Sequence, residues 1–187
     1  MNQKKIVITG GPSTGKTAVI QKLEKLGFAC FHEVIRSMTL VEKKQNKDVS
    51  FSSNPIVSVN DPIAFNLKLL KERERQFDLA RELEDRLVFF DRGLPDVLAY
   101  MDCFGQQYDE TFLVPCRRTV YDQVFLMPPW KDIFKTDNER FESYTESERI
   151  FECLKNTYER LGYLIHIVPK ASIDQRIDLI LNHLKHE

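Results

Sequence analysis

The feature that most restricts the fold of this chain is a glycine-rich octapeptide placed directly after an apolar run. Residues Gly10 to Thr17 read Gly-Gly-Pro-Ser-Thr-Gly-Lys-Thr, which matches the pattern G-x-x-x-x-G-K-[ST], and Ile6-Val7-Ile8 precede them. Apolar side chains then recur at helical spacing up to Gly27, namely Val19, Ile20, Leu23 and Leu26. A strand, a glycine-rich turn and a helix are the context in which this pattern binds phosphate. We therefore predict a phosphate-binding loop and not a chance turn.

Each part of this loop has an expected physical task. Its backbone N–H groups would surround the phosphates at the positive end of the helix dipole. Lys16 would contact the β- and γ-phosphates, and the Thr17 hydroxyl would hold Mg²⁺. ATP is the expected nucleotide, Mg²⁺ is the expected metal, and GTP stays open. The predicted nucleotide-binding residues are Gly10, Gly11, Pro12, Ser13, Thr14, Gly15, Lys16, Thr17 and Ala18.

Short apolar runs alternate with helical stretches along the 187 residues. The expected strands are Ile6–Thr9, Phe28–Phe31, Leu87–Phe90, Val124–Met127 and Tyr163–Val168. The helix starts between and after them are marked by the N-cap Asp61-Pro62 and by the capping boxes Ser143-x-x-Glu146 and Ser172-x-x-Gln175. Strands separated by helices imply a parallel sheet with right-handed crossovers. We predict an α/β, three-layer P-loop NTPase fold of the nucleoside- or nucleotide-kinase-like type. It would form one domain over residues 1–187, with about five parallel strands and helices on both faces.

Composition limits the class of protein and its partners. The net charge is −1 with 29% charged residues, so nothing indicates nucleic acid as a main partner. No apolar run reaches the length of a membrane span. The first residues lead straight into the predicted first strand, so we expect no signal peptide and a cytoplasmic location. The four cysteines and four histidines show no metal-ligand spacing.

Two segments depart from the strand–helix alternation. Residues 46–60 are polar and rich in Ser and Asn, and both a mobile functional loop and a plain surface connection stay open for them. Residues 128–141 carry several cations after the fourth strand, and we interpret them as a lid over the phosphates. Lys131, Lys135 and Arg140 could cover the γ-phosphate, and Arg140, oriented by Asp137, is the preferred candidate.

The predicted third strand ends in an acidic residue, Asp91, which is followed by Arg92 and Gly93. A carboxylate at this position of a P-loop protein binds Mg²⁺ directly or through water, so Asp91 is expected to complete the metal site with Thr17. Motor-type ATPases commonly place a glutamate after this aspartate. Arg92 in its place disfavours a hydrolase. Asp91-Arg92-Gly93 instead resembles the Asp-Arg-x or Glu-Arg-Ser signature of thymidylate-kinase-like and deoxynucleoside kinases, which implies that the guanidinium orients phosphates or the acceptor. A surface ion pair with Glu33 or Asp96 is the alternative.

Further candidates follow the predicted second strand. Glu33 would lie at the carboxyl edge of the sheet, where it could accept the proton of an acceptor hydroxyl. Asp91 is the other candidate for this base. Arg36 could hold an acceptor phosphate or simply pair with Glu33 along a helix. Asp96 completes the expected acceptor pocket. The predicted catalytic residues are thus Lys16, Glu33, Asp91, Arg92 and Arg140, and the predicted substrate residues are Glu33, Arg36 and Asp96.

Several of these motifs occur together in a known family. In chain order they are the Gly10–Thr17 loop, Glu33-x-x-Arg36, Phe90 to Asp96 with Ala99-Tyr100, Pro128-Pro129-Trp130 with Asp137 to Arg140, Tyr158-x-x-x-Gly162-Tyr163, and Val168-Pro169. Over nearly its whole length the chain resembles the AAA-domain family of small P-loop proteins. That family includes the ribosylnicotinamide-kinase domain of the bacterial NAD regulator and an animal GTP-binding trafficking protein. The resemblance implies ATP or GTP binding at the loop with Asp91 near the metal.

The sequence therefore favours a Mg-dependent, ATP-binding kinase that transfers the γ-phosphoryl group to a small nucleoside- or nucleotide-like acceptor. The alternative is a nucleotide-dependent switch, with ATP or GTP, that acts on a protein partner and has no small-molecule acceptor. The two differ in the acceptor pocket, because only a kinase needs Glu33, Arg36 and Asp96 to converge beside the γ-phosphate.

Overall fold

The sheet has five strands that pair in the order β2-β3-β1-β4-β5, and every pair is parallel. The computed structural model describes residues 3–35, 61–134 and 143–185. The strands are β1 (Lys4–Gly10), β2 (Ala29–Phe31), β3 (Leu87–Asp91), β4 (Gln123–Met127) and β5 (Ile165–Ile167). All five coincide with the predicted strands to within two residues at each end. Because β1 lies in the centre, its carboxyl end is flanked by the ends of β3 and β4, where open α/β sheets bind ligands.

The described residues form six α-helices and one 3₁₀ turn, and the helices that follow Asp61, Ser143 and Ser172 start where the sequence signals placed them. They are α1 (Lys16–Lys25), α4 (Pro62–Ala80), α5 (Pro95–Cys103), α6 (Glu110–Arg118), the 3₁₀ turn η1 (Lys131–Ile133), α7 (Tyr144–Arg160) and α8 (Ile173–Lys185). Asp61 caps α4 by accepting a hydrogen bond from Ala64 N at 3.0 Å. Ser143 and Glu146 form the predicted capping box of α7. Ser172 and Gln175 form the capping box before α8, since Gln175 N donates to Ser172 Oγ at 3.3 Å and Ser172 N donates to Gln175 Oε1 at 3.1 Å. All three predicted N-terminal caps are therefore confirmed.

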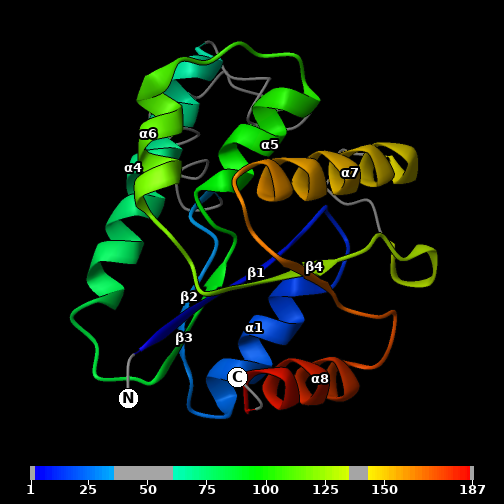
Figure 1. Ribbon diagram of the computed structural model, residues 1–187. Coiled ribbons are helices and arrows are strands. Elements are labelled where there is room, and N and C mark those ends of the chain that lie inside the picture. Colours follow the sequence, from blue (N-terminus) through cyan, green and yellow to red (C-terminus); the bar gives the residue numbers. More distant parts are fainter. Residues whose placement is uncertain (1–2, 36–60, 135–142, 186–187) are drawn as a thin grey trace, which may run out of the picture.

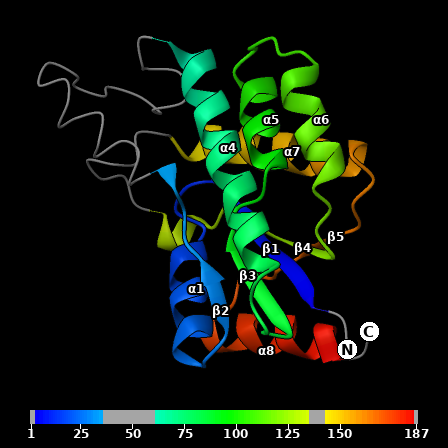
Figure 2. The same cartoon turned by 90° about the vertical axis from the view of Figure 1, so that its left-hand side faces the viewer.

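Helices cover both faces of the sheet, which gives the predicted three layers. α1 and α8 lie on one face, whereas α4, α5, α6 and α7 lie on the other (Figures 1 and 2). Alternate strand residues divide between two apolar clusters because successive side chains point to opposite faces. Ile6, Ile8 and Phe125 pack with α1 and α8, while Val7 and Phe90 pack with the larger layer.

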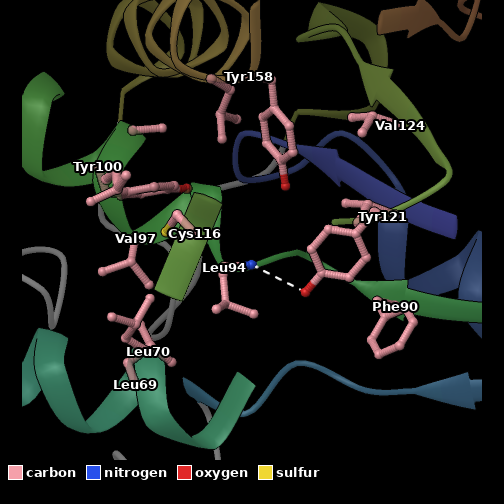
Figure 3. Packing of buried hydrophobic residues seen from close by; sticks show 14 of the residues in the cluster. Leu69, Leu70, Phe90, Leu94, Val97, Tyr100, Cys116, Tyr121, Val124 and Tyr158 are labelled. Atoms are coloured by element: carbon pink, nitrogen blue, oxygen red, sulfur yellow. Dashed lines mark hydrogen bonds between the residues drawn. The ribbon is translucent and has the colours of Figure 1, made fainter. Parts of the chain in front are cut away.

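The larger cluster positions the turn that joins β3 to α5. The hydroxyl of Tyr121 accepts a hydrogen bond from Leu94 N at 3.3 Å, and its ring meets Phe90 edge-on with centroids 5.3 Å apart (Figure 3). Tyr158 reaches the same turn from α7, and its side chain is fully buried. Two tyrosines from different elements therefore support the turn that carries Arg92 and Gly93.

Some sequence predictions fall outside the described residues. These are the loop at 46–60, Arg36, and the part of the predicted lid from 135 to 141, which includes Arg140. Its first part, Pro128 to Phe134, is described, and η1 lies within it. In the parts of the chain that the structure describes, no helix has the length and apolar character needed to cross a membrane.

Candidate functional site

The glycine-rich loop runs from the end of β1 into the start of α1. Gly15 precedes the helix with a left-handed backbone, φ 87°, which favours glycine. Among the described residues no side chain caps the helix start, so the first N–H groups of α1, at Lys16, Thr17 and Ala18, can meet an anion. Ser147 of α7 donates a hydrogen bond to the Pro12 carbonyl at 3.3 Å and so joins the loop to α7.

The Lys16 ammonium is folded over the loop. Its Nζ lies 2.7 Å from the Gly11 carbonyl oxygen and 3.4 Å from Thr14 Oγ1. Burial lowers the pKa of Lys16 to about 7, and the nearby charge of Arg92 lowers it too, while Asp91 and Glu33 raise it. The amine is thus held in a place where negative charge from a phosphate would favour its protonated form.

Asp91 ends β3 beside the glycine-rich loop. The parallel pairing of β1 and β3 places Asp91 opposite Ile8, two residues before the loop begins. Its side chain is 4% exposed, and among the described residues Oδ1 is buried without a hydrogen-bond partner. Burial raises the pKa of Asp91, and Lys16 opposes this rise.

This arrangement fits a bound magnesium ion. An unpartnered, buried carboxylate oxygen is costly unless it has a ligand, and Mg²⁺ prefers one or two carboxylates together with phosphate oxygens and water. Thr17 is the second residue of α1, directly after Lys16, and its hydroxyl is the group with which P-loop proteins contact the same ion. Asp91 and Thr17 are therefore the residues that would hold it.

Arg92 follows Asp91 in an unusual backbone conformation. Its φ of 77° is left-handed, which costs a residue with a side chain about 1–3 kcal/mol. Its guanidinium is fixed on three sides. Nε lies 2.5 Å from Glu33 Oε2, Nη1 lies 3.0 Å from Asp96 Oδ1, and Nη2 donates to Tyr100 OH at 3.1 Å. The ion pairs with Glu33 and Asp96 given above as the alternative are both present, but they are largely buried and not a surface feature.

Glu33 receives two guanidinium groups. Besides Arg92, Arg73 of α4 donates to Glu33 Oε1 at 3.0 Å, and the Ile35 N–H donates to the same oxygen at 3.2 Å. Burial alone would raise the pKa of Glu33, but the two arginines outweigh burial and hold it below its ordinary value. The carboxylate is therefore ionised near neutral pH, at the sheet edge where the sequence placed it.

Both carboxylate oxygens of Asp96 accept hydrogen bonds from other groups of the protein. Thr9 Oγ1 donates to Oδ1 at 2.5 Å, and Gly93 N and Tyr158 OH donate to Oδ2 at 3.0 and 2.6 Å. Burial would raise the pKa of Asp96, but Arg92, Arg73 and these hydrogen bonds hold it low. Asp96 thus orients Arg92 in this structure, and the substrate contact expected from sequence stays a prediction.

Sequence reasoning assigned no role to three of these residues, Arg73, Thr9 and Tyr158, although Tyr158 belongs to one of the motifs on which the family resemblance rests. Arg73 lies within the charged run Lys-Glu-Arg-Glu-Arg at 71–75, which reads as a solvent-exposed helix face. In the structure its side chain is almost fully buried, and Nη1 also donates to the Gly93 carbonyl at 3.0 Å. Lys131, a candidate for the lid, lies exposed on η1.

With the loop, the aspartate and the paired arginines in place, comparison with known proteins identifies the family. A family model described as an AAA domain matches residues 5–176. The chain belongs to this AAA domain family. The resemblance inferred from the motifs is thereby confirmed. No curated protein is a significant match to the sequence.

Solved structures share the fold of this AAA domain protein. Deoxyadenosine kinase from M. mycoides, solved with the products dCMP and dCDP, is 18% identical with a TM-score of 0.69 over 98% of this chain and 100% of its own. Thymidylate kinase from Candida albicans is 16% identical with a TM-score of 0.71, over 98% and 92%. NadR in complex with NAD and AMP-PNP is 16% identical with a TM-score of 0.68, over 98% of this chain and 49% of NadR. The predicted kinase-like P-loop fold is confirmed.

Proposed function

We propose that this protein is a Mg-dependent kinase that transfers the γ-phosphoryl group of ATP to a small, nucleoside- or nucleotide-like acceptor. The observation that carries the proposal is the ionised Glu33, held between Arg73 and Arg92 at the sheet edge that also carries Lys16 and Asp91. A nucleotide-dependent switch has no need for a carboxylate so placed, and a hydrolase is disfavoured because Arg92, not a glutamate, follows Asp91. The shared fold with deoxyadenosine kinase and thymidylate kinase supports the same reaction class.

On the donor side, the chain binds the triphosphate. The N–H groups at the start of α1 and the Lys16 ammonium face the phosphates, and Thr17 and Asp91 hold the metal. When bound, Mg²⁺ neutralises charge that develops between the β- and γ-phosphates. Lys16 enters the complex protonated, because phosphate contact raises its pKa from about 7. ATP is the proposed donor, with GTP as the alternative nucleotide. A cytoplasmic location is also part of the proposal.

On the acceptor side, Glu33 orients the acceptor hydroxyl and takes its proton. A strongly basic group is not required, because the transition state of phosphoryl transfer is loose and the proton moves late. What matters is that Glu33 is ionised and fixed, and its two arginines supply both conditions. Arg92, held in turn by Asp96, stabilises charge on the transferring group. We assign Arg140 and Arg36 the same supporting roles as predicted from sequence.

An acceptor screen tests the proposal directly. Nucleosides, nucleoside monophosphates and ribosylnicotinamide are offered with MgATP, and ADP release is measured with and without each acceptor. We expect at least one to accelerate ADP release. The variant Lys16→Ala should lose ATP affinity, and Glu33→Gln should lose about 10²–10⁴-fold in kcat with little change in ATP affinity, as for removal of a general base.

The same screen distinguishes the proposed kinase from the alternative function, a nucleotide-dependent switch. Tight ATP or GTP binding without stimulation by any acceptor, together with an unaffected Glu33→Gln variant, would contradict the kinase and favour the switch that acts on a protein partner. Undiminished ATP binding by Lys16→Ala would contradict both, because each depends on the glycine-rich loop.

A further inference from the structure

Arg176, in the first turn of α8, joins three segments that are far apart in the sequence. Its Nη1 donates to the Thr14 carbonyl of the glycine-rich loop at 2.9 Å, and its Nε donates to the Ala171 carbonyl at 2.8 Å. The guanidinium also lies over the Trp130 indole, 4.9 Å from the ring centroid. The residue is 4% exposed. A charged side chain of α8 is therefore built into the wall of the donor loop.

The charge of Arg176 is not balanced in the way that the other buried arginines are. Arg73 and Arg92 both face carboxylates. Among the described residues, the hydrogen-bond partners of Arg176 are two neutral carbonyls, and no carboxylate forms an ion pair with it. Burial lowers the pKa of Arg176. A buried cation without an anion is costly, so a polyanion bound next to it would recover part of that cost.

The contact with Thr14 also fixes the direction of a peptide group. In a trans peptide the carbonyl and the following N–H point in opposite directions, and the described chain contains no cis peptide. Because the Thr14 carbonyl points at Arg176, the Gly15 N–H points away from Arg176. A Cβ on Gly15 would lie 2.9 Å from Arg176 Nη1, so the guanidinium packs directly against this residue. Arg176 thus restrains the last peptide before α1.

We propose that Arg176 is a positioning residue of the donor phosphate site. It holds the Thr14–Gly15 peptide with its N–H toward the phosphates, and its buried charge is balanced when a polyphosphate binds. The inference rests on the proposed function only in that the loop binds a polyphosphate. Trp130 covers the outer face of the guanidinium and couples it to the segment after β4.

Binding of two probes tests this role. Inorganic tripolyphosphate carries the phosphates alone, and ATP adds the nucleoside. Calorimetric titration compares the parent protein with Arg176→Met, which removes the charge at similar volume. We expect about tenfold or greater loss of affinity for both probes, because a hydrogen bond from a charged group and its field are both removed. AMP, with one phosphate, should lose much less affinity than ATP.

A matched control lies in the same helix pair. Lys22 of α1 forms an exposed ion pair with Asp174 of α8 at 3.1 Å and does not contact the loop. Lys22→Met removes a cation from the same α1–α8 interface. We expect its affinity for tripolyphosphate and ATP to change less than about twofold, because a surface ion pair contributes little. Arg176→Lys keeps the charge but cannot reach both carbonyls, so its affinity should fall between those of the parent and Arg176→Met.

The outcomes separate this inference from the proposed function. Unchanged affinity of Arg176→Met for both probes, while Lys16→Ala loses it, overturns the positioning role and leaves the kinase proposal standing. A parent protein that binds neither probe overturns both. If Arg176→Met does not fold, Arg176→Lys and Trp130→Leu decide the question, and equal losses for ATP and AMP would show a merely structural role.

Discussion

Tyr158 donates a hydrogen bond to Asp96 at 2.6 Å, although the two residues are 62 positions apart in the chain. The bond joins α7 to the start of α5, and Asp96 in turn holds Arg92 at 3.0 Å. α7 follows the segment predicted as a lid. A single buried hydroxyl therefore links the helix after that segment to the arginine that we assign to the transferring phosphoryl group.

Tyr158→Phe should lower both stability and turnover. The variant leaves the ring in place but removes one donor from a buried carboxylate, which costs about 1–3 kcal/mol. Arg92 then loses part of its orientation, so kcat should fall more than ATP affinity. Urea unfolding and acceptor-dependent ADP release measure the two effects. Tyr108→Phe is the matched control, because Tyr108 donates to Asp102, another carboxylate of α5, at 2.8 Å. Equal loss of kcat in both variants would remove the link to Arg92.

Gly93→Ala should be destabilising for a purely steric reason. A Cβ at this position would lie 2.7 Å from the Tyr158 hydroxyl and 3.0 Å from Tyr121 Cε2. The tyrosine hydroxyl cannot move away freely because Asp96 accepts its hydrogen bond. We expect a loss of about 1–3 kcal/mol in the free energy of unfolding, as for other overpacked sites.

A double-mutant cycle identifies the neighbour responsible for this cost. In Tyr158→Phe the oxygen nearest to the added methyl group is absent, so Gly93→Ala should cost less there than in the parent. We expect a coupling energy of about 0.5–3 kcal/mol from urea unfolding of the four proteins. Strict additivity would show that Tyr121 or Val7, whose Cγ2 would lie 3.1 Å from the added Cβ, limits the space instead of Tyr158.

The sequence was sufficient for the parts of this protein that depend on local pattern. The five strands, the glycine-rich loop and the caps at Asp61 and Ser143 are each specified by a few neighbouring residues, and the structure confirms them. Glu33 and Asp91 were found because the carboxyl ends of parallel strands converge at one edge. These are consequences of topology that follow once the strand–helix alternation is recognised.

The sequence was not sufficient for side chains that reach the site from helices. Arg73 and Arg176 both belong to polar stretches, and only the packing of α4 and α8 turns these two arginines inward. Helical spacing shows which residues share a face but not which neighbour that face meets. The role of Asp96 likewise depends on Tyr158, whose hydroxyl arrives from a helix that begins 48 positions later.

Asp91→Asn should make the free protein more stable and lower the proposed kinase activity. The Asp91 carboxylate is buried, and burial raises its pKa, so its ionised form opposes folding. The amide removes this charge, and the melting temperature at pH 7 should rise. The difference in melting temperature between this variant and the parent should narrow as the pH falls through the raised pKa of Asp91. At that pH the Asp91 of the parent takes up a proton in the folded state.

The same substitution weakens the metal site. With only Thr17 left as a ligand from the chain, Asp91→Asn should need a higher Mg²⁺ concentration for half-maximal ADP release, whereas ATP affinity measured in EDTA should stay close to that of the parent. A variant with unchanged Mg²⁺ dependence would show that Asp91 does not hold the metal.

The lowered pKa of Lys16 predicts that the protein takes up a proton when it binds nucleotide. Its pKa of about 7 in the free protein leaves it mostly neutral at pH 8, and contact with phosphates favours the charged form. Binding at pH 8 should therefore take up about one proton, and binding at pH 6 should take up close to none. Because the pKa of Lys16 in the folded protein lies below its ordinary value of 10.5, this lysine opposes folding most below pH 7, and stability rises as the pH increases from about 7 toward 10.5.

Calorimetry in buffers with different ionisation enthalpies measures this proton directly. The observed binding enthalpy at pH 8 should differ between HEPES and Tris by the ionisation difference multiplied by the number of protons taken up. Lys16→Met should remove both the dependence on buffer and most of the affinity. Lys22→Met, which removes only the exposed ion pair with Asp174, should retain both. Equal enthalpies in the two buffers for the parent protein would show that Lys16 is already charged before the nucleotide binds. The lowered pKa would then be excluded as a feature of the donor site.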